Sequence, residues 1–315
     1  MRALVTGAAG FIGSTLAERL LADGVDLVGI DSFTDYYPRA IKEQNIAALR
    51  RHPRFRFVEA RIQDADLRAL LADRTHVFHL AAQAGVRKSW GTDFAVYTVN
   101  NIEATQVLLE AACARPLERF VYASSSSAYG DNAAVPMRED ALPQPVSPYG
   151  VTKLAAEQLC YLYHVNHGVP AVSLRYFTVY GPRQRPDMGF HRFLRATLEG
   201  RPLTLFGDGA QTRDFTFVQD AVSATIAAAL LGVPGRVYNI GGGSRVSVND
   251  VLDLIGRVVG RRPTVTVEAT QKGDMRHTWA DTSLARADLK FAPRVSLEEG
   301  LTAEYRWLAA LLAPR

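Results

Sequence analysis

The sequence predicts an α/β fold in which helices cover both faces of a doubly wound parallel sheet, joined to a smaller α/β domain. Three observations support this prediction. Short apolar runs alternate with helical segments in the first half of the chain, a glycine-rich turn follows the first run, and the alternation loosens after residue 176. Alternating strands and helices are typical of parallel sheets, because each crossover helix returns the chain to the same edge. The 315 residues, 48% of them hydrophobic, are enough for two joined domains with a large core.

Seven short apolar runs are expected to be the buried strands of the large sheet. They are Ala3–Val5, Leu27–Ile30, Phe55–Val58, Val77–Leu80, Phe120–Tyr122, Ala171–Tyr176 and Val237–Ile240. Helical periodicity marks the segments Thr15–Leu21, Val96–Cys113, Pro148–His167, Val218–Leu231 and Val248–Val259. Ser147 and Ser247 stand where an N-cap is expected, directly before the third and the fifth of these helices.

The domain boundaries follow from where the alternation stops and resumes. Residues 177–216 hold many Gly, Pro, Arg and Asp residues, which interrupt regular elements. We therefore predict a dinucleotide-binding domain of the Rossmann type from residues 1–176 plus about 217–243. A smaller substrate-binding domain is predicted from about 177–216 plus 244–315.

Composition and charge exclude several classes of protein. Lys and Arg number 36 and Asp and Glu 32, so the net charge of +4 is spread without a basic tract, which argues against nucleic-acid binding. Cys113 and Cys160 are too few for a disulfide framework, so we expect a reducing, cytoplasmic location. No apolar run reaches the ~18 residues that a membrane span needs. Residues 1–10 are interpreted as strand and turn rather than as a signal peptide, and no metal site is predicted.

Three glycines follow the first predicted strand and open the first helix. Gly7, Gly10 and Gly13 have the spacing G-x-x-G-x-x-G, with Phe11 and Ile12 between the last two. Such glycines permit a tight turn and let backbone N–H groups approach a pyrophosphate at the start of a helix. A purely structural turn is the alternative. The position of the loop directly after the first strand favours dinucleotide binding.

Asp31 ends the second predicted strand, where a carboxylate can accept hydrogen bonds from both ribose hydroxyls. It would repel a 2′-phosphate, so NAD is expected rather than NADP. A loop or capping role for Asp31 is the alternative. Lys42 is one of few lysines and a candidate contact for the cofactor phosphates. A solvated helix lysine is an equally good interpretation of it.

Tyr149 and Lys153 lie four residues apart at the start of a predicted helix, so they share one face. A phenol has an ordinary pKa near 10, which makes it a poor base at neutral pH. An ammonium about 4 Å away at an effective dielectric constant of about 20 supplies roughly 4 kcal/mol, or about three pKa units. We therefore expect Lys153 to lower the pKa of Tyr149. Taken alone, this spacing also occurs by chance on surface helices.

A run of four serines, Ser124 to Ser127, follows the fifth predicted strand. The carboxyl ends of parallel strands meet at the ligand crevice of such sheets. Hydroxyl groups there can orient a reacting alcohol and polarise the ketone that it forms. Most serine clusters are plain loops, but this one stands beside the glycine loop, Asp31 and the Tyr149–Lys153 pair in the expected topology.

Together these motifs resemble those of the extended short-chain dehydrogenase/reductase family, specifically its NAD-dependent nucleotide-sugar epimerases and dehydratases. Further motifs that carry the resemblance are His79–Ala82, Asn100–Asn101, Arg175–Pro182 and Gly207–Phe215. The resemblance implies that Ser125 is the catalytic hydroxyl, Tyr149 the base and Lys153 its tuner. It also implies further residues that line the cofactor, namely Ile62, Leu80, Ala81, Ala82, Asn100 and Tyr176.

Two departures from family patterns are informative. The family usually has Gly-Asp after the third strand, with the Asp touching adenine, whereas this chain has Ala60-Arg61. Asp64, the backbone, or stacking by Arg61 would have to replace that contact. The serine run also contains none of the acids that dehydratases and decarboxylases of the family carry there. This favours a simple epimerase.

The segments Ala82–Arg87, Phe177–Pro182 and Arg185–Met188 look most like those of UDP-glucuronate 4-epimerases. Arg185 stands where the second domain begins, and an arginine binds a carboxylate in a bidentate way. A structural salt bridge is the alternative, and Arg87 is a second candidate. Further hydroxyls for the carboxylate are expected from Ser126, Ser127 and Thr178.

The diphosphate of a nucleotide sugar carries two anionic groups, for which Arg213 and Arg276 are the expected cations. Solvated or domain-bridging roles are the alternatives for both. The resemblance also places uracil near Thr204, Phe206 and Gln211.

The expected activity is therefore NAD-dependent C4 epimerisation of UDP-glucuronate to UDP-galacturonate through a 4-keto intermediate. A UDP-glucose or UDP-N-acetylglucosamine 4-epimerase is the alternative. A UDP-glucuronate decarboxylase and a non-catalytic NAD-binding protein fit the sequence less well. In the family, helices matching about 93–113 and 148–167 form a four-helix dimer interface, so we expect a homodimer. Leu154, Leu159 and Leu162 would serve that interface or face the sheet.

Overall fold

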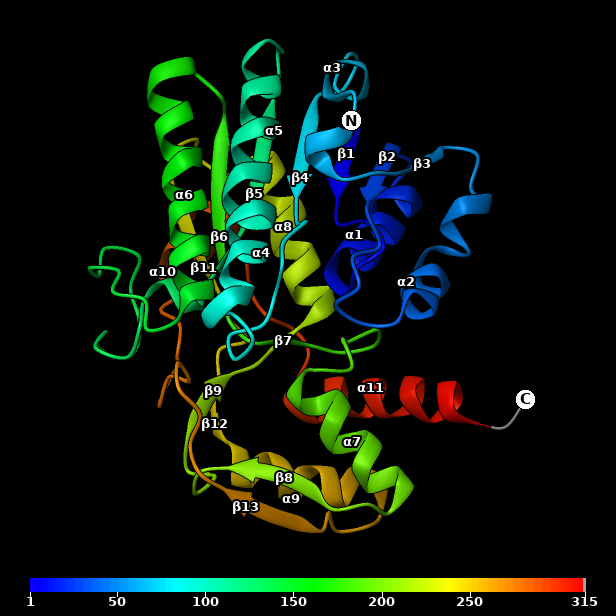
Figure 1. Cartoon of the computed structure of the whole chain (residues 1–315), viewed down its shortest axis with the longest axis vertical. Helices are drawn as coiled ribbons and strands as arrows, with labels where there is room; N and C mark the ends of the chain where they lie inside the picture. The colour runs from blue at the N-terminus through cyan, green and yellow to red at the C-terminus, as the bar shows by residue number, and fades with distance from the viewer. Residues whose placement is uncertain (314–315) are drawn as a thin grey trace.

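A seven-stranded parallel sheet forms the centre of the protein, whose computed structural model describes residues 1–313 (Figure 1). The strand order is β11-β6-β5-β4-β1-β2-β3, and every neighbouring pair is parallel. The strands are β1 (Arg2–Thr6), β2 (Asp26–Asp31), β3 (Phe55–Glu59), β4 (His76–His79), β5 (Arg119–Ser125), β6 (Ala171–Tyr176) and β11 (Val237–Ile240). The order reverses between β1 and β4, and a crevice opens at that point beyond the carboxyl ends of the strands. The predicted fold class is confirmed.

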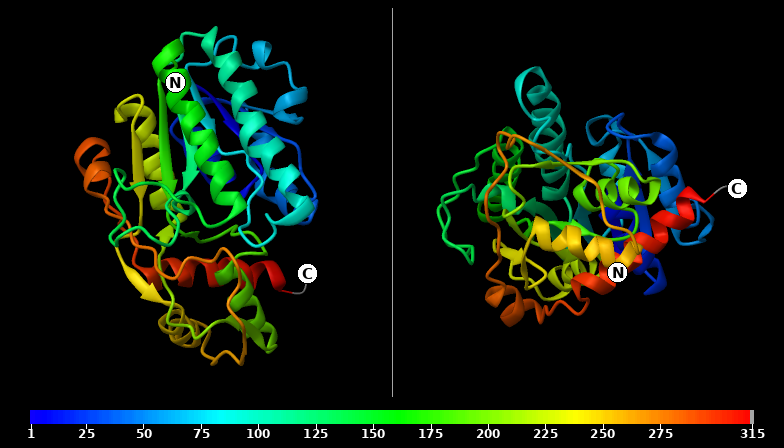
Figure 2. Two further views of the ribbon diagram at one scale, coloured as in Figure 1. Left: turned by 60° about the vertical axis from the view of Figure 1, so that its left-hand side comes forward. Right: turned by 90° about the horizontal axis from the view of Figure 1, so that it is seen from below.

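Helices cover both faces of this sheet (Figures 1 and 2). One face carries α1 (Phe11–Ala22) packed beside α8 (Val218–Leu231), and the other carries α5 (Ala104–Cys113) packed beside α6 (Pro148–His167). The short helices of this part of the chain are α2 (Arg39–Ile46), α3 (Leu67–Leu70) and α4 (Phe94–Tyr97).

The hydrophobic core is divided in two by the sheet. Successive residues of a strand point to opposite faces. Ala3 and Val5 of β1 therefore join the cluster beneath α1 and α8, whereas Leu4 joins the cluster beneath α5 and α6. All three side chains are fully buried. A strand that is buried on both faces has a continuous run of apolar residues, and this run is what located the strand in the sequence.

The segment predicted as one helix over Val96–Cys113 is interrupted by a π-helical turn. Thr98–Glu103 form that turn between α4 and α5. It directs the buried Asn101 inward, where its Nδ2 donates to Thr152 Oγ1 of α6 at 2.9 Å and to the Gln83 carbonyl oxygen at 3.0 Å. Single π turns inside helices are frequent at functional sites. Here the turn ties the helix that carries Tyr149 to the loop after β4.

A second group of elements lies beyond the carboxyl edge of the sheet (Figure 1). It contains the helices α7 (Gly189–Glu199), α9 (Val248–Val259) and α11 (Leu297–Leu312), which pack on one another. Short strands pair in twos, namely β7 (Val179–Tyr180) with β10 (Thr216–Phe217), β8 (Leu203–Phe206) with β13 (Val265–Glu268), and β9 (Thr212–Asp214) with β12 (Arg245–Ser247). Helix α10 (Ser283–Leu289) packs back on α8.

We propose that the large sheet with its helices is the first predicted domain and that this second group of elements is the smaller one. The chain leaves the sheet after β6 and returns to it for α8 and β11. Residues 314–315 of the last predicted segment lie outside the described residues. Within residues 1–313, no helix is long and apolar enough to cross a membrane. The same residues gather no three His, Cys, Asp or Glu side chains in a way that could hold a metal ion.

A buried ion pair joins α6 to the two strands that it covers. Glu157 of α6 accepts hydrogen bonds from Arg175 Nη2 at 2.6 Å and from Arg175 Nε at 3.0 Å, and Arg175 belongs to β6. The same carboxylate accepts from Ser124 Oγ of β5 at 2.6 Å. Glu157 is 1% and Arg175 3% exposed. The pair thus fixes the helix that starts at Pro148 against the strand that ends at Ser125.

Substituting Arg175 by Met should destabilise the protein by about 3–5 kcal/mol, because it leaves the Glu157 carboxylate buried without its cation. The measurement is the free energy of unfolding in urea. The matched control is Arg138→Met, which removes a bidentate but exposed pair with Asp140. If both variants lost the same small amount of stability, the pair would not be the constraint inferred here.

Candidate active site

A cavity of about 920 Å³ opens where the carboxyl ends of the strands face the second group of elements. All but one of the predicted site residues line it. On the cofactor side these are Gly7, Gly10, Phe11, Ile12, Gly13, Asp31, Lys42, Ile62, Leu80, Ala81, Ala82, Asn100, Tyr149, Lys153 and Tyr176. On the substrate side these are Arg87, Ser125, Ser126, Ser127, Thr178, Arg185, Thr204, Phe206, Gln211 and Arg213. The exception is Arg276.

The glycine loop is a cradle that side chains would fill. Gly7 has a φ of +69°, which side-chain-bearing residues rarely adopt, and a Cβ on Gly13 would lie 2.1 Å from the Gly7 carbonyl oxygen. Helix α1 begins at Phe11 with Gly10 as N-cap and with no side chain capping its first N–H groups. Those donors are therefore free to face an anionic group in the cavity.

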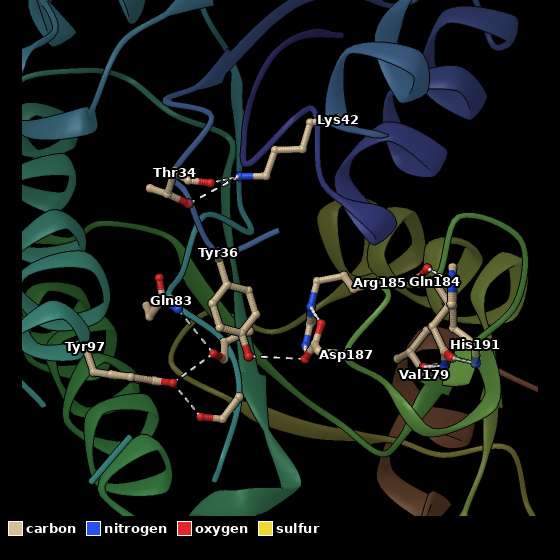
Figure 3. Close-up of polar contacts among 12 residues, drawn as sticks. Thr34, Tyr36, Lys42, Gln83, Tyr97, Val179, Gln184, Arg185, Asp187 and His191 are labelled. Atoms are coloured by element: carbon tan, nitrogen blue, oxygen red, sulfur yellow. Dashed lines mark hydrogen bonds and ion pairs between the residues drawn. The ribbon is translucent and has the colours of Figure 1, made fainter. Parts of the chain in front are cut away.

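Asp31 and Lys42 both hold the backbone around this cradle. Asp31 accepts from the Ala9 N–H at 3.1 Å and from the Phe33 N–H at 2.9 Å, so its carboxylate is fixed at the cavity edge. Lys42 is buried, and its Nζ donates to the Thr34 carbonyl oxygen at 3.0 Å and to Thr34 Oγ1 at 3.2 Å (Figure 3). The lysine is thus not a solvated helix residue; it fixes the turn that follows β2.

The cavity wall after β3 is formed by Ala60, Arg61, Ile62 and Gln63. Gln63 Nε2 donates to the Val99 carbonyl oxygen at 2.8 Å, which anchors this wall to the π-helical turn. Asp64 is not among the lining residues, so it does not replace the carboxylate that the family usually has here. Stacking of Arg61 on a purine stays a prediction.

Tyr149 projects from the first turn of α6, which begins as the sequence predicts. Ser147 caps the helix by accepting from the Gly150 N–H at 3.1 Å, and Pro148 occupies its first turn. Burial raises the pKa of the Tyr149 phenol, while a hydrogen bond with Ser125 and the positive charge of Arg185 act in the opposite direction. The ring of Tyr97 packs edge-on against the Tyr149 ring, with 6.2 Å between centroids.

The expected effect of Lys153 on Tyr149 is not found. Burial lowers the pKa of Lys153 itself to about 7, so the side chain is only partly charged at neutral pH. Its Nζ lies 4.6 Å from the centre of the Tyr122 ring. Desolvation raises the pKa of Tyr149, and the groups that act against this rise are the Ser125 hydrogen bond and then the charge of Arg185. The sequence spacing put Lys153 on the same helix as Tyr149, one turn further along, but could not show how deeply the lysine is buried.

Arg185 is held by two residues that sequence reasoning missed (Figure 3). Its Nε and Nη2 donate to the two carboxylate oxygens of Asp187, each at 3.0 Å. Tyr36, from the turn after β2, donates its hydroxyl to Asp187 Oδ2 at 3.2 Å. The short spacing from Arg185 was a signal for Asp187, whereas no sequence signal indicated Tyr36.

The remaining arginines differ in how they are paired. Arg87 Nη2 lies 2.8 Å from Asp274, and its guanidinium stacks on Phe206 at 4.1 Å from the ring centre. Arg276 forms a bidentate pair with Asp208, which holds it outside the cavity lining. Arg213 donates only to backbone carbonyl oxygens and has no carboxylate partner within residues 1–313.

Two of the residues expected at the nucleobase lie together. Gln211 Nε2 donates to the Phe206 carbonyl oxygen at 3.0 Å. The Oε1 of Gln211 is buried and has no hydrogen-bond partner among residues 1–313. A buried acceptor without a partner is costly, so it is suited to a donor that arrives with a ligand.

The model of the NAD-dependent epimerase/dehydratase family matches residues 3–241. The chain belongs to this family. Its sequence is 46% identical to a Bacillus subtilis relative named as an uncharacterized UDP-glucose epimerase, with 99% of each chain covered. It is 38% identical to a UDP-glucuronate 4-epimerase of Thermodesulfobacterium geofontis, over 96% of this chain and 95% of that one.

Among solved structures of the epimerase/dehydratase family, the UDP-glucuronic acid 4-epimerase of Bacillus cereus superposes with a TM-score of 0.96. That structure is 48% identical to this chain, covers 99% of it and 100% of its own, and contains UDP-glucuronic acid and NAD. The predicted family, and with it the Rossmann-type sheet, is confirmed.

The glycine cradle, the uncapped start of α1 and the carboxylate of Asp31 fit the NAD that this epimerase/dehydratase family uses. Gly7, Gly10 and Gly13 would meet its pyrophosphate, and Asp31 its ribose. Lys42 supports the turn beside Asp31, so its contribution to cofactor binding is proposed as indirect.

Replacing Lys153 by Met should lower kcat by about 10²–10⁴-fold, the range that a group assisting acid–base catalysis contributes. The same variant should melt at a higher temperature than the wild type at pH 6.5. Because the pKa of Lys153 falls from 10.5 to about 7 on folding, the folded state binds fewer protons than the unfolded one over that range. Wild-type stability from this group therefore rises with pH between about 7 and 10.5, and the charged lysine costs most below pH 7.

Scanning fluorimetry between pH 6 and 10 measures this difference. The melting-temperature gap between the two proteins should close as the pH rises. A gap that stayed constant over this range would contradict a buried lysine that loses its proton on folding.

Proposed function

We propose that the protein inverts C4 of UDP-glucuronate to give UDP-galacturonate. The observation that carries the proposal is that Tyr149, Arg185 and Arg213 line one cavity, in which Arg213 has no carboxylate partner among residues 1–313. One cation is thus available for the sugar carboxylate and another for the diphosphate. The similarity to the Thermodesulfobacterium and Bacillus cereus enzymes supports the same substrate.

Tyr149 is proposed as the group that takes the proton of the C4 hydroxyl and later returns it. A hydrogen bond with Ser125 and the charge of Arg185 favour its deprotonated form and act against the desolvation that raises its pKa. Ser125 is proposed to orient the same hydroxyl. Its Oγ accepts from the Ser127 N–H at 3.1 Å, and its hydroxyl also hydrogen-bonds Tyr149, so Ser125 lies next to the proposed base.

When bound, NAD⁺ supplies the redox chemistry by accepting hydride from C4 and returning it to the opposite face, so it is not consumed. The residues of the chain therefore have to bind the diphosphate firmly while the 4-keto sugar turns over. We propose Arg213 for that anchor, since a half-buried guanidinium without a carboxylate partner is electrostatically suited to a phosphate. Arg276 would join it only after leaving Asp208.

The uridine is proposed to lie against Phe206, with Gln211 Oε1 accepting from the base. Arg87 already stacks on Phe206 and pairs with Asp274, so it is proposed to cover this subsite rather than to bind the sugar carboxylate. Ser126, Ser127 and Thr178 line the cavity and are proposed to add hydroxyl contacts to that carboxylate.

The alternative is a 4-epimerase of a neutral UDP-sugar, in which Arg185 is structural. Its bidentate pair with Asp187 supports this alternative, as does the name of the Bacillus subtilis relative. The pair leaves Nη1 without a hydrogen-bond partner within residues 1–313, and that free group favours the acidic sugar.

Purified protein incubated with UDP-glucuronate and no added cofactor should produce UDP-galacturonate, because the recycled NAD is retained through purification. Anion-exchange chromatography or NMR resolves the two sugars. Tyr149→Phe, which keeps the ring but removes the hydroxyl, should lose this conversion. Turnover of UDP-glucose in a parallel reaction, with none of the acid, would move the assignment to the neutral-sugar epimerases.

We also propose that the protein is a homodimer in the cytoplasm. Exposed apolar side chains share one face of α6, where Val151, Leu162 and Val165 are 44%, 50% and 60% exposed, with Tyr161 beside them. Leu159 packs instead against the core beneath α5 and α6. Such a face is suited to burial against a second copy. The free thiols of Cys113 and Cys160 support a reducing compartment.

The Leu162→Glu variant should elute as a monomer in size-exclusion chromatography with light scattering, because a charge in an apolar interface is costly to bury. Leu142→Glu is the control, since Leu142 is 73% exposed and lies outside α5 and α6. A wild-type protein of monomer mass would rule out the dimer.

A further inference from the structure

Arg185 does not stand alone at the cavity wall, because Asp187 and Tyr36 form a clamp around it (Figure 3). Asp187 binds the Nε/Nη2 edge of the guanidinium through both carboxylate oxygens at 3.0 Å. Tyr36 donates to Asp187 Oδ2 at 3.2 Å, and its ring centre lies 5.8 Å from the Arg185 guanidinium carbon. Each member contacts the other two.

The main chain beneath the clamp is fixed as well. Gln184 is buried, and its side chain bonds the Val179 carbonyl oxygen at 3.2 Å and the His191 N–H at 2.9 Å. These contacts tie the residue before Arg185 to β7 and to α7. The freedom left to Arg185 therefore lies in its side chain, which is what Asp187 and Tyr36 restrict.

Tyr36 reaches the clamp from a segment that is far from Arg185 in the sequence. It belongs to the turn after β2 that Lys42 holds through Thr34. Its hydroxyl fits against Gly85, where an added Cβ would lie 2.1 Å from that oxygen. The orientation of Arg185 is thus set jointly by the cofactor-side turn and the substrate-side segment.

We propose that Asp187 and Tyr36 are positioning residues that make the epimerase keep the carboxyl group of its substrate, an inference that rests on the proposed function. Their hydrogen bonds use one edge of the guanidinium and turn the other edge, with Nη1, toward the sugar carboxylate. A guanidinium held in one orientation binds a carboxylate in one plane.

That plane matters because of a competing reaction. Once C4 has been oxidised, the substrate is a β-keto acid. If the C5–C6 bond aligns with the carbonyl π system, it breaks and CO₂ leaves. The electron pair of the broken bond forms an enolate with the C4 ketone, and the enolate takes a proton at C5 to give a 4-keto pentose. A carboxylate held in one place and orientation by Arg185 restricts where C6 lies relative to the ring, which keeps the C5–C6 bond from that alignment.

The clamp also separates orientation from charge. Asp187 is an anion beside the expected carboxylate, so it weakens the attraction between Arg185 and the acid substrate. Attraction of an acidic substrate by itself gives no reason to place the carboxylate of Asp187 beside Arg185. Control of orientation gives one, because the same anion fixes the guanidinium.

Asp187→Asn and Tyr36→Phe test this with UDP-glucuronate, with the ratio of decarboxylated to epimerised product as the readout. Both variants should raise that ratio at least about tenfold, since a misplacement of about 1 Å changes oriented reactions by up to about 10²-fold. The KM of Asp187→Asn for the acid should not rise, because the variant removes an anion. Tyr36→Phe removes only a hydroxyl and covers the case in which Asp187→Asn does not fold.

The control is Asp140→Asn, which breaks an Arg138 pair of the same two-residue spacing and bidentate geometry outside the cavity. An unchanged product ratio on the acid would overturn the inference. If the wild type did not epimerise UDP-glucuronate at all, the proposed function itself would fail.

Discussion

The buried ion pair between Glu157 and Arg175 is the constraint on which the arrangement of the site depends. It joins α6 to β6, and through Ser124 it joins both to β5. Tyr149 and Lys153 come from α6, and Ser125 comes from the end of β5. Apolar packing alone would allow the helix to slide or rotate on the sheet, whereas a bidentate pair in a dry interior has one satisfied geometry. The proposed base Tyr149 and the proposed hydroxyl of Ser125 are thus positioned by an ion pair that lies outside the cavity lining.

The arginines of the cavity are distinguished by how far their charge is already balanced. Arg185 and Arg87 are paired with Asp187 and Asp274, whereas Arg213 has only backbone carbonyl oxygens as partners among residues 1–313. A paired arginine still orients a ligand but contributes less net attraction, while an unpaired one contributes mainly attraction. This division fits the two roles proposed above. Arg213 would bind the diphosphate firmly, and Arg185 would orient the reacting sugar.

Several features of the site cost stability that the rest of the fold has to supply. Lys153 is buried with a pKa lowered to about 7, and Gln211 Oε1 is left without a partner within residues 1–313. Gly7 keeps a positive φ for the sake of the cradle. Groups of this kind are held in place only when the surrounding structure over-determines them. The two core clusters and the Glu157–Arg175 pair supply that surrounding structure.

The sequence by itself determined the class of the fold, the family and most members of the site. Continuous apolar runs such as Leu27–Ile30 located strands buried on both faces, and capping residues such as Ser147 located helix starts, because both patterns are local. Of the site residues that the sequence analysis named, all except Arg276 line the cavity. These successes rest on spacing along the chain.

Only the tertiary structure decided which charged groups meet. Tyr36 and Asp187 are 151 residues apart, so no local pattern links them, yet their hydrogen bond sets the surroundings of Arg185. The same holds for Lys153, whose pKa depends on burial among side chains from several elements, and for Arg276, which Asp208 holds outside the cavity. The π-helical turn at Thr98–Glu103 was invisible for a related reason, since helical periodicity averages over one inserted residue. The burial of a side chain and the partner of a charge depend on residues that are adjacent in the folded structure but distant in the sequence. A local sequence pattern therefore does not show them.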